Sequence, residues 1–310
     1  MRGVRHTERG IEVVDVPDPD ADGTVVHVRS ASICGSDLHM LNMGPLPFTL
    51  GHEFAGELDD GTAVAIDPTL PCGQCDACTA GNAHLCRTGA ERVLGIAVDG
   101  GLADVVAIGA RRTVPLPNGM PIEHACLVEP VGVAVHGARL AGLSGGERVA
   151  VVGAGAIGLA AVAAAGLAAG DVGLVARHDA QRAAGERLGA AAASGEYDVV
   201  FEAAGTESAL ATAAELCRPD GTIVLLSTQW EPVALPGFMP AMKELSFKWS
   251  YTYSAHDHGH DLDDAAALLA ANPEIADTLV THRFPLADAA EAFRVAGDRA
   301  HGAIKVVIEP

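Results

Sequence analysis

The chain has 310 residues, 49% of them hydrophobic, and a formal net charge of −20 at pH 7. Its length suggests two domains, at about 100 to 200 residues per domain, and a chain of this size can bury a substantial core. The acidic excess excludes nucleic acid as a natural partner, because phosphate binding requires clustered Lys and Arg.

The first 120 or so residues have the sequence pattern of a β-rich domain. Short alternating segments such as residues 25–28 are separated by frequent Gly and Pro. Residues 1–6 lead into no apolar stretch of the signal-peptide type, so we expect a cytoplasmic protein. Residues 149–170 carry no charge and are long enough to cross a bilayer, but they divide into a strand, a glycine turn and a helix. We therefore expect no membrane span.

Four cysteines lie within fifteen residues in the spacing C-x2-C-x2-C-x7-C: Cys72, Cys75, Cys78 and Cys86. Four thiolates on one tight loop match the closed tetrahedral coordination of a structural zinc site. The alternative is a polar loop with free or disulfide-bonded thiols. A reducing compartment argues against the disulfides, so the spacing predicts a structural zinc ion.

A second metal site is indicated by Cys34 and His52, which are well separated in the chain. Catalytic zinc takes its ligands from different segments and keeps one coordination position open. Asp37 is a candidate acceptor for the non-coordinating nitrogen of His52, whose tautomer it would fix. The alternative is that Cys34 and His52 only fill the core.

From about residue 131 to residue 250 the pattern changes to alternating strands and helices. Expected strands at 149–152, 172–175, 198–201 and 222–226, with a helix at 181–188 among the crossovers, predict a doubly wound parallel sheet of the α/β class. The run Gly153-Ala154-Gly155-Ala156-Ile157-Gly158 directly follows the first strand. In this context it predicts a dinucleotide site with the pyrophosphate at a helix N-terminus, the alternative being a packing turn.

The end of the second expected strand favours NADP(H) over NAD(H). An NAD site places a carboxylate there to bind the ribose, whereas this chain reads Val175-Ala176-Arg177-His178. Ala176 permits a 2′-phosphate and Arg177 can pair with it. In the alternative, Arg177 and His178 are solvated and Asp179 reaches the ribose. We also place Arg182 and Ser227 at the cofactor.

Taken together, these motifs resemble those of the zinc-dependent medium-chain alcohol dehydrogenases, almost from end to end. Further matching segments are Leu127-Val128-Glu129-Pro130 and Leu225-Leu226-Ser227. The Cys-Gly-Ser-Asp and Glu-Pro forms are closest to the polyol and threonine dehydrogenase branch. The resemblance implies a GroES-like catalytic domain (1–130 and 251–310, with a zinc lobe at about 70–90), a Rossmann domain (131–250), and a homodimer or homotetramer.

The resemblance also implies roles for particular residues. A carboxylate completes the catalytic zinc site in this branch, so Glu53 is the first choice and Glu129 the second, directly or through water. Ser36 would take the hydroxyl proton and pass it through the nicotinamide ribose to His39 and solvent. In the alternative, Ser36 caps a helix that begins near Asp37 and His39 is only exposed. Cys126 and Cys217 are expected to be packing residues.

The chain departs from the family after the second crossover. Relatives commonly have a strand and a helix there, but only residues 191–197 separate the end of the helix from the next strand. A full strand with a parallel crossover needs a dozen or more residues. We therefore expect a third strand that is a stub or absent, with its helix deleted. In the tail we expect helices at 262–271 and 286–295 and a strand at 304–308, folded onto the first domain.

The leading hypothesis is a zinc-dependent oxidoreductase that transfers hydride between NADP(H) and a secondary alcohol, polyol or ketone, a small-molecule substrate. One alternative is a reductase of activated C=C or C=N bonds on the same fold. An alternative of another class is a non-catalytic protein that binds zinc and a nucleotide.

Overall fold

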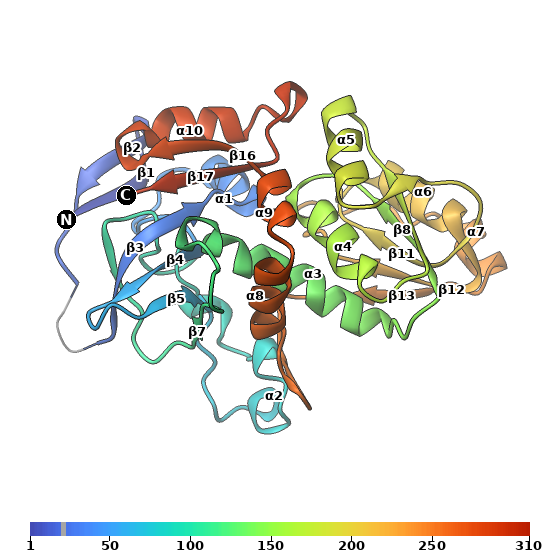
Figure 1. Ribbon diagram of the computed structural model, residues 1–310, viewed down its shortest axis with the longest axis horizontal. Helices are drawn as coiled ribbons and strands as arrows, with labels where there is room; N and C mark the ends of the chain where they lie inside the picture. Colours follow the sequence, from blue (N-terminus) through green and yellow to red (C-terminus); the bar gives the residue numbers. More distant parts are fainter. Residues whose placement is uncertain (20–22) are drawn as a thin grey trace. The chain divides into compact units, whose positions relative to one another are not determined.

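The computed structural model describes residues 1–19 and 23–310. The chain divides into two compact units, and both are drawn in Figure 1. Unit 1 comprises residues 1–129, 254–276 and 280–310, and unit 2 comprises residues 130–253 and 277–279. Among the described residues no helix has the length and apolarity needed to cross a membrane.

Unit 1 is built on a mixed sheet in the order β16-β17-β3-β4-β5-β7, with β6 also paired to β3. Figure 1 shows the C-terminal β17 beside the N-terminal β3. The strands of unit 1 are β1 (Arg2–Thr7), β2 (Gly10–Asp15), β3 (Val25–Ser32), β4 (Glu53–Leu58), β5 (Ala63–Ile66), β6 (Val105–Ala107), β7 (Thr113–Pro115), β14 (Ala255–His256), β15 (Gly259–His260), β16 (Val280–Pro285) and β17 (Lys305–Glu309).

The helices of unit 1 are short, and several are 3-10 turns. They are α1 (Gly35–Met40), η1 (Leu41–Met43), α2 (Asp76–Thr79), η2 (Ala83–Leu85), η3 (Ala90–Arg92), η4 (Ile122–Leu127), α8 (Asp261–Ala271), η5 (Leu286–Asp288), α10 (Ala289–Ala296) and η6 (Arg299–His301). Helix α9 (Pro273–Leu279) ends with the three residues that cluster with unit 2. The core gathers alternate strand residues such as Val28, Phe54 and Ile308 with Leu50 and Phe293. This packing fixes β3 between β4 and β17, which positions the polar residues described below.

Unit 2 is a six-stranded parallel sheet in the order β10-β9-β8-β11-β12-β13. Its strands are β8 (Arg148–Val152), β9 (Asp171–Val175), β10 (Ala191–Ala192), β11 (Tyr197–Glu202), β12 (Cys217–Leu225) and β13 (Ser246–Trp249). Its helices are α4 (Ala156–Gly166), α5 (Asp179–Arg187), α6 (Glu207–Leu216) and α7 (Phe238–Met242), together with most of α3 (Val128–Ala141). The strand order reverses direction between β8 and β11, which is where open α/β sheets bind their ligands.

Helices cover both faces of this sheet. Helix α6 packs on Val200 and Ile223 within one apolar cluster. Phe201 points to the other face by strand alternation and lies against Gly137 of α3. The arrangement confirms the predicted doubly wound α/β architecture.

The third strand is a stub, as the short segment predicts. Strand β10 has two residues, both exposed, and pairs with β9 at Ala191↔Gly173 and Ala192↔Leu174. The chain then crosses to β11 without a helix, and Arg148 of β8 holds the connection. Its guanidinium donates to the carbonyl oxygens of Glu196 (2.5 Å) and Ser194 (3.2 Å) and lies 4.5 Å from the ring centroid of Tyr197.

Tyr197 completes this connection. Its hydroxyl accepts the Ser194 backbone N–H at 2.8 Å, and its side chain is buried under β9. A Cβ at position 173 would lie 2.2 Å from the Tyr197 oxygen, so only glycine fits there. The Tyr197 side chain of β11 therefore fills the space against Gly173 of β9, next to the two-residue strand β10.

Candidate active site

Cys34 stands at the junction of strand β3 and helix α1, where it is the residue that precedes the first helical turn. The Asp37 carboxylate accepts the backbone N–H of Cys34 through Oδ2 at 2.8 Å, which satisfies one of the amides left free at a helix start. The helix begins at Gly35, so Ser36 lies inside the first turn. The alternative that Ser36 caps a helix beginning near Asp37 is therefore wrong. His39 lies in the last turn of the same helix and is half-buried.

His52 precedes strand β4 and turns its ring toward the start of α1. Its Nδ1 lies 3.4 Å from Asp37 Oδ1, and its Nε2 lies 3.4 Å from Ser36 Oγ. Both Nδ1 and Asp37 Oδ1 are buried without a hydrogen-bond partner at this separation. Burial alone would lower the pKa of His52, but the negative charges of Asp37 and Cys34 outweigh it and hold that pKa well above its usual value.

Cys34, His52 and Glu53 form a group whose candidate ligand atoms all lie within 4.8 Å of one another. A thiolate, an imidazole and a carboxylate match the three protein ligands of a catalytic zinc centre, which keeps its fourth position open. The orphaned His52 Nδ1 facing Asp37 Oδ1 agrees with this, since a metal-binding imidazole gives its other N–H to an acceptor. The three residues thus fit a zinc ion.

Glu129 lies outside this group of three, in the first turn of α3. Its side chain is buried, and burial together with the charges of Glu53 and Asp67 raises its pKa to about 7, although His52 and Lys305 act in the opposite direction. Of the two carboxylates weighed from the sequence, Glu53 is therefore the one that the structure brings to Cys34 and His52.

The sequence analysis missed the partner of Glu53. Lys305 of β17 places its ammonium 2.8 Å from Oε1 and 2.7 Å from Oε2 of Glu53, and both side chains are buried. Ser32 of β3 also donates its hydroxyl to Oε2. Burial would lower the pKa of Lys305, but the charges of Glu53 and Cys34 outweigh it and raise that pKa. The available signal was a lysine inside the apolar run of residues 304–308.

Two cysteines outside the motifs are packing residues in unit 1 and unit 2. Cys126 is fully buried, and burial followed by the nearby Glu53 raises the pKa of its thiol to about 11. Burial likewise raises the pKa of Cys217 to about 11. Both side chains are fully buried and pack in the cores of their units, as expected from the sequence.

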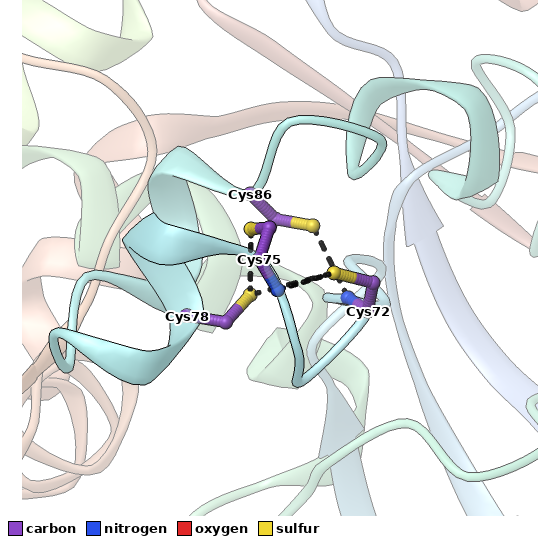
Figure 2. A group of neighbouring side chains, drawn as sticks. All are labelled: Cys72, Cys75, Cys78 and Cys86. Carbon is purple, nitrogen blue, oxygen red and sulfur yellow. Dashed lines mark hydrogen bonds between the residues drawn. The ribbon is translucent and has the colours of Figure 1, made fainter.

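The four-cysteine lobe is already folded around one point, as Figure 2 shows. The candidate sulfur atoms of Cys72, Cys75, Cys78 and Cys86 lie within 4.8 Å of one another. Cys86 Sγ accepts the Cys72 N–H at 3.1 Å, and this hydrogen bond is the main reason that the pKa of Cys86 is lowered to about 6. Burial and the neighbouring thiols raise the pKa of Cys78 to about 12. Four such sulfurs carry charge together only around a cation, so the lobe fits a tetrahedral zinc ion.

The glycine run forms the expected turn between β8 and α4. Gly153 has φ 105°, which favours glycine, and a Cβ at Gly158 would lie 1.8 Å from the Gly153 carbonyl oxygen. Gly155 immediately precedes α4, so Ala156, Ile157 and Gly158 form its first turn. Their backbone amides are free to meet a phosphate, as in other glycine turns at helix starts.

The end of β9 carries the residues predicted to select the cofactor. Ala176 and His178 are half-buried and Arg177 is exposed. Within the described residues Arg177 makes no ion pair. Arg182 pairs with Asp179 across one turn of α5 and donates to the Ala176 carbonyl oxygen at 3.2 Å. Asp179 therefore already has a cationic partner.

Ser227 lies just beyond β12 and is bonded within unit 2. It donates to Glu202 and accepts the side-chain N–H of Gln229 at 2.9 Å. Glu202, at the end of β11, accepts the backbone N–H groups of Ala204 (2.8 Å) and Gly205 (2.7 Å). The sequence analysis missed Glu202, which holds the loop at the carboxyl edge of the sheet.

A third group with metal-ligand chemistry, His256, Asp261 and Asp264, lies at the start of α8. His256 Nε2 is 3.0 Å from Asp264 Oδ2, its Nδ1 accepts the His258 N–H at 3.3 Å, and Asp261 accepts the Ser254 N–H at 2.7 Å. His256 is therefore bonded to Asp264, and Asp261 to the backbone of Ser254.

Comparison with known proteins agrees with the geometry of both units. The alcohol dehydrogenase GroES-like domain matches residues 20–118, and the zinc-binding dehydrogenase domain matches residues 173–308. L-idonate 5-dehydrogenase (NAD(P)(+)) of Escherichia coli K12 is 30% identical over 321 residues, which cover 92% of each chain. The chain belongs to the zinc-dependent medium-chain alcohol dehydrogenase superfamily.

Solved structures of dehydrogenases share the whole fold of this superfamily member. Galactitol-1-phosphate dehydrogenase from Escherichia coli is 28% identical with a TM-score of 0.89, covering 100% of both chains. A zinc-binding dehydrogenase from Sinorhizobium meliloti 1021, solved with NADP bound, is 30% identical with a TM-score of 0.86, covering 100% of this chain and 99% of that one. The alcohol dehydrogenase described here is thus an oxidoreductase of the polyol and threonine dehydrogenase branch.

Proposed function

We propose that this alcohol dehydrogenase transfers hydride between NADP(H) and a secondary alcohol, polyol or ketone at a zinc site formed by Cys34, His52 and Glu53. The observation that carries the proposal is the convergence of these three side chains within 4.8 Å. A zinc ion held there would supply Lewis-acid polarisation of the substrate oxygen. A second zinc ion in the four-cysteine lobe would have a structural role.

The residues of α1 account for the movement of the proton in the proposed reaction. Ser36 Oγ lies 3.4 Å from His52 Nε2, beside the three candidate ligands, where it can accept the substrate hydroxyl proton. His39 is one turn further along the same helix and half-buried, so it can pass the proton to solvent. Asp37 orients His52 from the opposite side of the ring.

The preference for NADP(H) is supported by charge at the end of β9. Position 176 has no carboxylate to repel a 2′-phosphate, and Arg177 is exposed without an ionic partner among the described residues. Asp179, which was the alternative contact to the ribose, is paired with Arg182. One relative in the same superfamily was solved with NADP bound.

We also propose that the protein is a homo-oligomer of the cytoplasm. Strand β13 is the last strand of the sheet in unit 2, and no strand among the described residues pairs with its outer edge. Trp249 at its end and Phe238 in α7 are 58% and 79% exposed. An open sheet edge beside large apolar side chains suits a self-complementary two-fold contact. All seven cysteines are free, as expected in a reducing compartment.

The test is an absorbance assay at the nicotinamide band over a panel of secondary alcohols, polyols and ketones, run with both cofactors. We expect turnover of at least one substrate, faster with NADP(H) than with NAD(H). Cys34→Ala should abolish that turnover while leaving the circular dichroism spectrum unchanged. Undiminished turnover in Cys34→Ala would refute the metal chemistry, and zinc-loaded protein that turned over nothing would favour the non-catalytic alternative.

A further inference from the structure

Lys305 is the one buried cation beside the candidate zinc ligands among the described residues, and the reaction proposed above does not use it. It reaches the site through the sheet register: β17 pairs with β3 at Val307↔Ser32, and β3 pairs with β4 at Ser32↔Glu53. Its ammonium contacts both oxygens of Glu53 at 2.7 and 2.8 Å and the Ile33 carbonyl oxygen at 3.3 Å. The side chain of Lys305 is 3% exposed and that of Glu53 is 0% exposed.

The contacts to Glu53 leave little of its carboxylate free for a metal. A carboxylate offers about four lone-pair positions, two on each oxygen. Lys305 occupies one position on each oxygen, and Ser32 occupies the second position on Oε2. One position remains, on Oε1, so Glu53 can contribute a single bond to an ion shared with Cys34 and His52.

The positive charge of Lys305 also weakens the binding of a metal by Glu53. Partners that orient a metal ligand are commonly carboxylates or carbonyl oxygens, which make the ligand more basic and strengthen metal binding. A buried ammonium on a ligand carboxylate does the reverse, because it competes with the metal for the same negative charge and is poorly screened there. It also neutralises Glu53 when no metal is present, which avoids a buried unpaired charge.

We propose that Lys305 is a positioning residue that holds Glu53 as a weak, one-point ligand of the catalytic zinc and so keeps that ligand displaceable. This inference rests on the proposed zinc site. It implies that Lys305 lowers the affinity of the catalytic site for zinc while stabilising the metal-free protein. The ammonium of Lys305 contacts Glu53 and the Ile33 carbonyl oxygen rather than the four-cysteine lobe, so zinc in that lobe should not respond to changes at Lys305.

The experiment measures zinc release from the loaded enzyme into a chromogenic chelator. Wild type should show two kinetic phases, and His52→Ala should lack the one that belongs to the catalytic site. In Lys305→Met the catalytic-site phase should slow by on the order of tenfold or more, a magnitude typical of changes to the partner of a ligand. Lys305→Arg, which keeps the charge, should release zinc within about twofold of wild type, and the second phase should be unchanged in every variant.

Thermal unfolding adds a readout that is independent of activity. Lys305→Met should lower the midpoint of the metal-free protein more than that of the zinc-loaded protein, since zinc replaces the lost counter-charge. If the Met variant does not fold, Lys305→Gln keeps an N–H donor without the charge and carries the same expectation. Equal or faster catalytic-site release in the neutral variants would overturn the role of Lys305 alone. A single zinc phase in wild type would overturn both this inference and the proposed zinc site.

Discussion

Asp37 serves the candidate site with each of its two oxygens. Oδ2 accepts the Cys34 N–H and so fixes the start of α1, while Oδ1 faces His52 Nδ1 at 3.4 Å. A single buried carboxylate therefore positions two of the three candidate zinc ligands. This explains why an acidic residue three positions after Cys34 accompanies the motif.

The variant Asp37→Asn separates the hydrogen bond to Cys34 from the charge that faces His52. The amide oxygen can still accept the Cys34 N–H, but the negative charge facing His52 is lost. We expect zinc affinity and kcat/KM to fall by roughly 10- to 100-fold, the usual effect of losing a partner that orients a ligand. Metal titration and steady-state kinetics measure this, and Asp76→Asn, in the four-cysteine lobe, is the control that should leave kcat/KM unchanged.

Arg177 carries the proposed choice of cofactor. In Arg177→Ala we expect kcat/KM for NADP⁺ to fall about 10- to 100-fold, since a hydrogen bond to a charged group contributes about 1.5 to 3 kcal/mol. With NAD⁺ the same variant should change by less than about twofold, because that cofactor has no 2′-phosphate. Equal losses with both cofactors would show that Arg177 does not bind the phosphate.

At the residue scale, sequence reasoning succeeds where the partners are close in the chain. One short motif contains Cys34, Ser36 and Asp37, and another contains His52 and Glu53. The spacing within each motif therefore indicates the chemistry of these residues. Lys305 was missed because its contact depends on strand register: it is paired with a residue 252 positions away. A lysine inside the apolar run of residues 304–308 was a local signal, but it does not identify the partner of that lysine. Glu202 was missed because its contacts with Ala204 and Gly205 depend on how the loop after β11 folds back.

Among the elements, the shortened crossover of unit 2 has the clearest physical explanation. The count of residues between α5 and β11 predicts a stub, and β10 is a stub. The sequence could not show how the chain returns, because that depends on Arg148 and Tyr197 meeting across the sheet. Arg148 also pairs with Asp171 at 3.0 Å, which ties β9 to the same side chain.

Arg148→Met should therefore destabilise unit 2 more than an ordinary surface substitution. It removes donors from two carbonyl oxygens and the cation over Tyr197, and we expect a loss of about 1 to 3 kcal/mol in the free energy of unfolding. Arg294→Met, which removes an exposed pair with Glu291 within α10, is the control and should cost about 0.5 kcal/mol or less. Denaturant unfolding distinguishes them, and equal costs would contradict the role of Arg148.

For the whole molecule, the sequence predicts a β-rich and an α/β part, and the structure forms a unit of each kind. The tail joins unit 1 because β16 and β17 extend the sheet containing β3 and β4. The proposed oligomer depends on a different surface, the open edge at β13. The composition of the chain does not reveal this surface, because Phe238 and Trp249 form an apolar patch only when α7 and β13 are folded.

Trp249→Glu tests that surface. A carboxylate at the edge of β13 would meet its own copy across a two-fold axis, so we expect the mass in solution to fall by half or more. Leu167→Glu, which changes another exposed apolar residue of unit 2 at the end of α4, should leave the mass unchanged. Light scattering after gel filtration gives the result, and an unchanged mass for Trp249→Glu would place the interface elsewhere.

The central claim is that Cys34, His52 and Glu53 hold a zinc ion separate from the one in the four-cysteine lobe. The most direct test is the zinc content per chain of wild type and of His52→Ala, purified in the same way and measured by elemental analysis. The account predicts two zinc ions in wild type and one in the variant. An identical zinc content in the two proteins would contradict it.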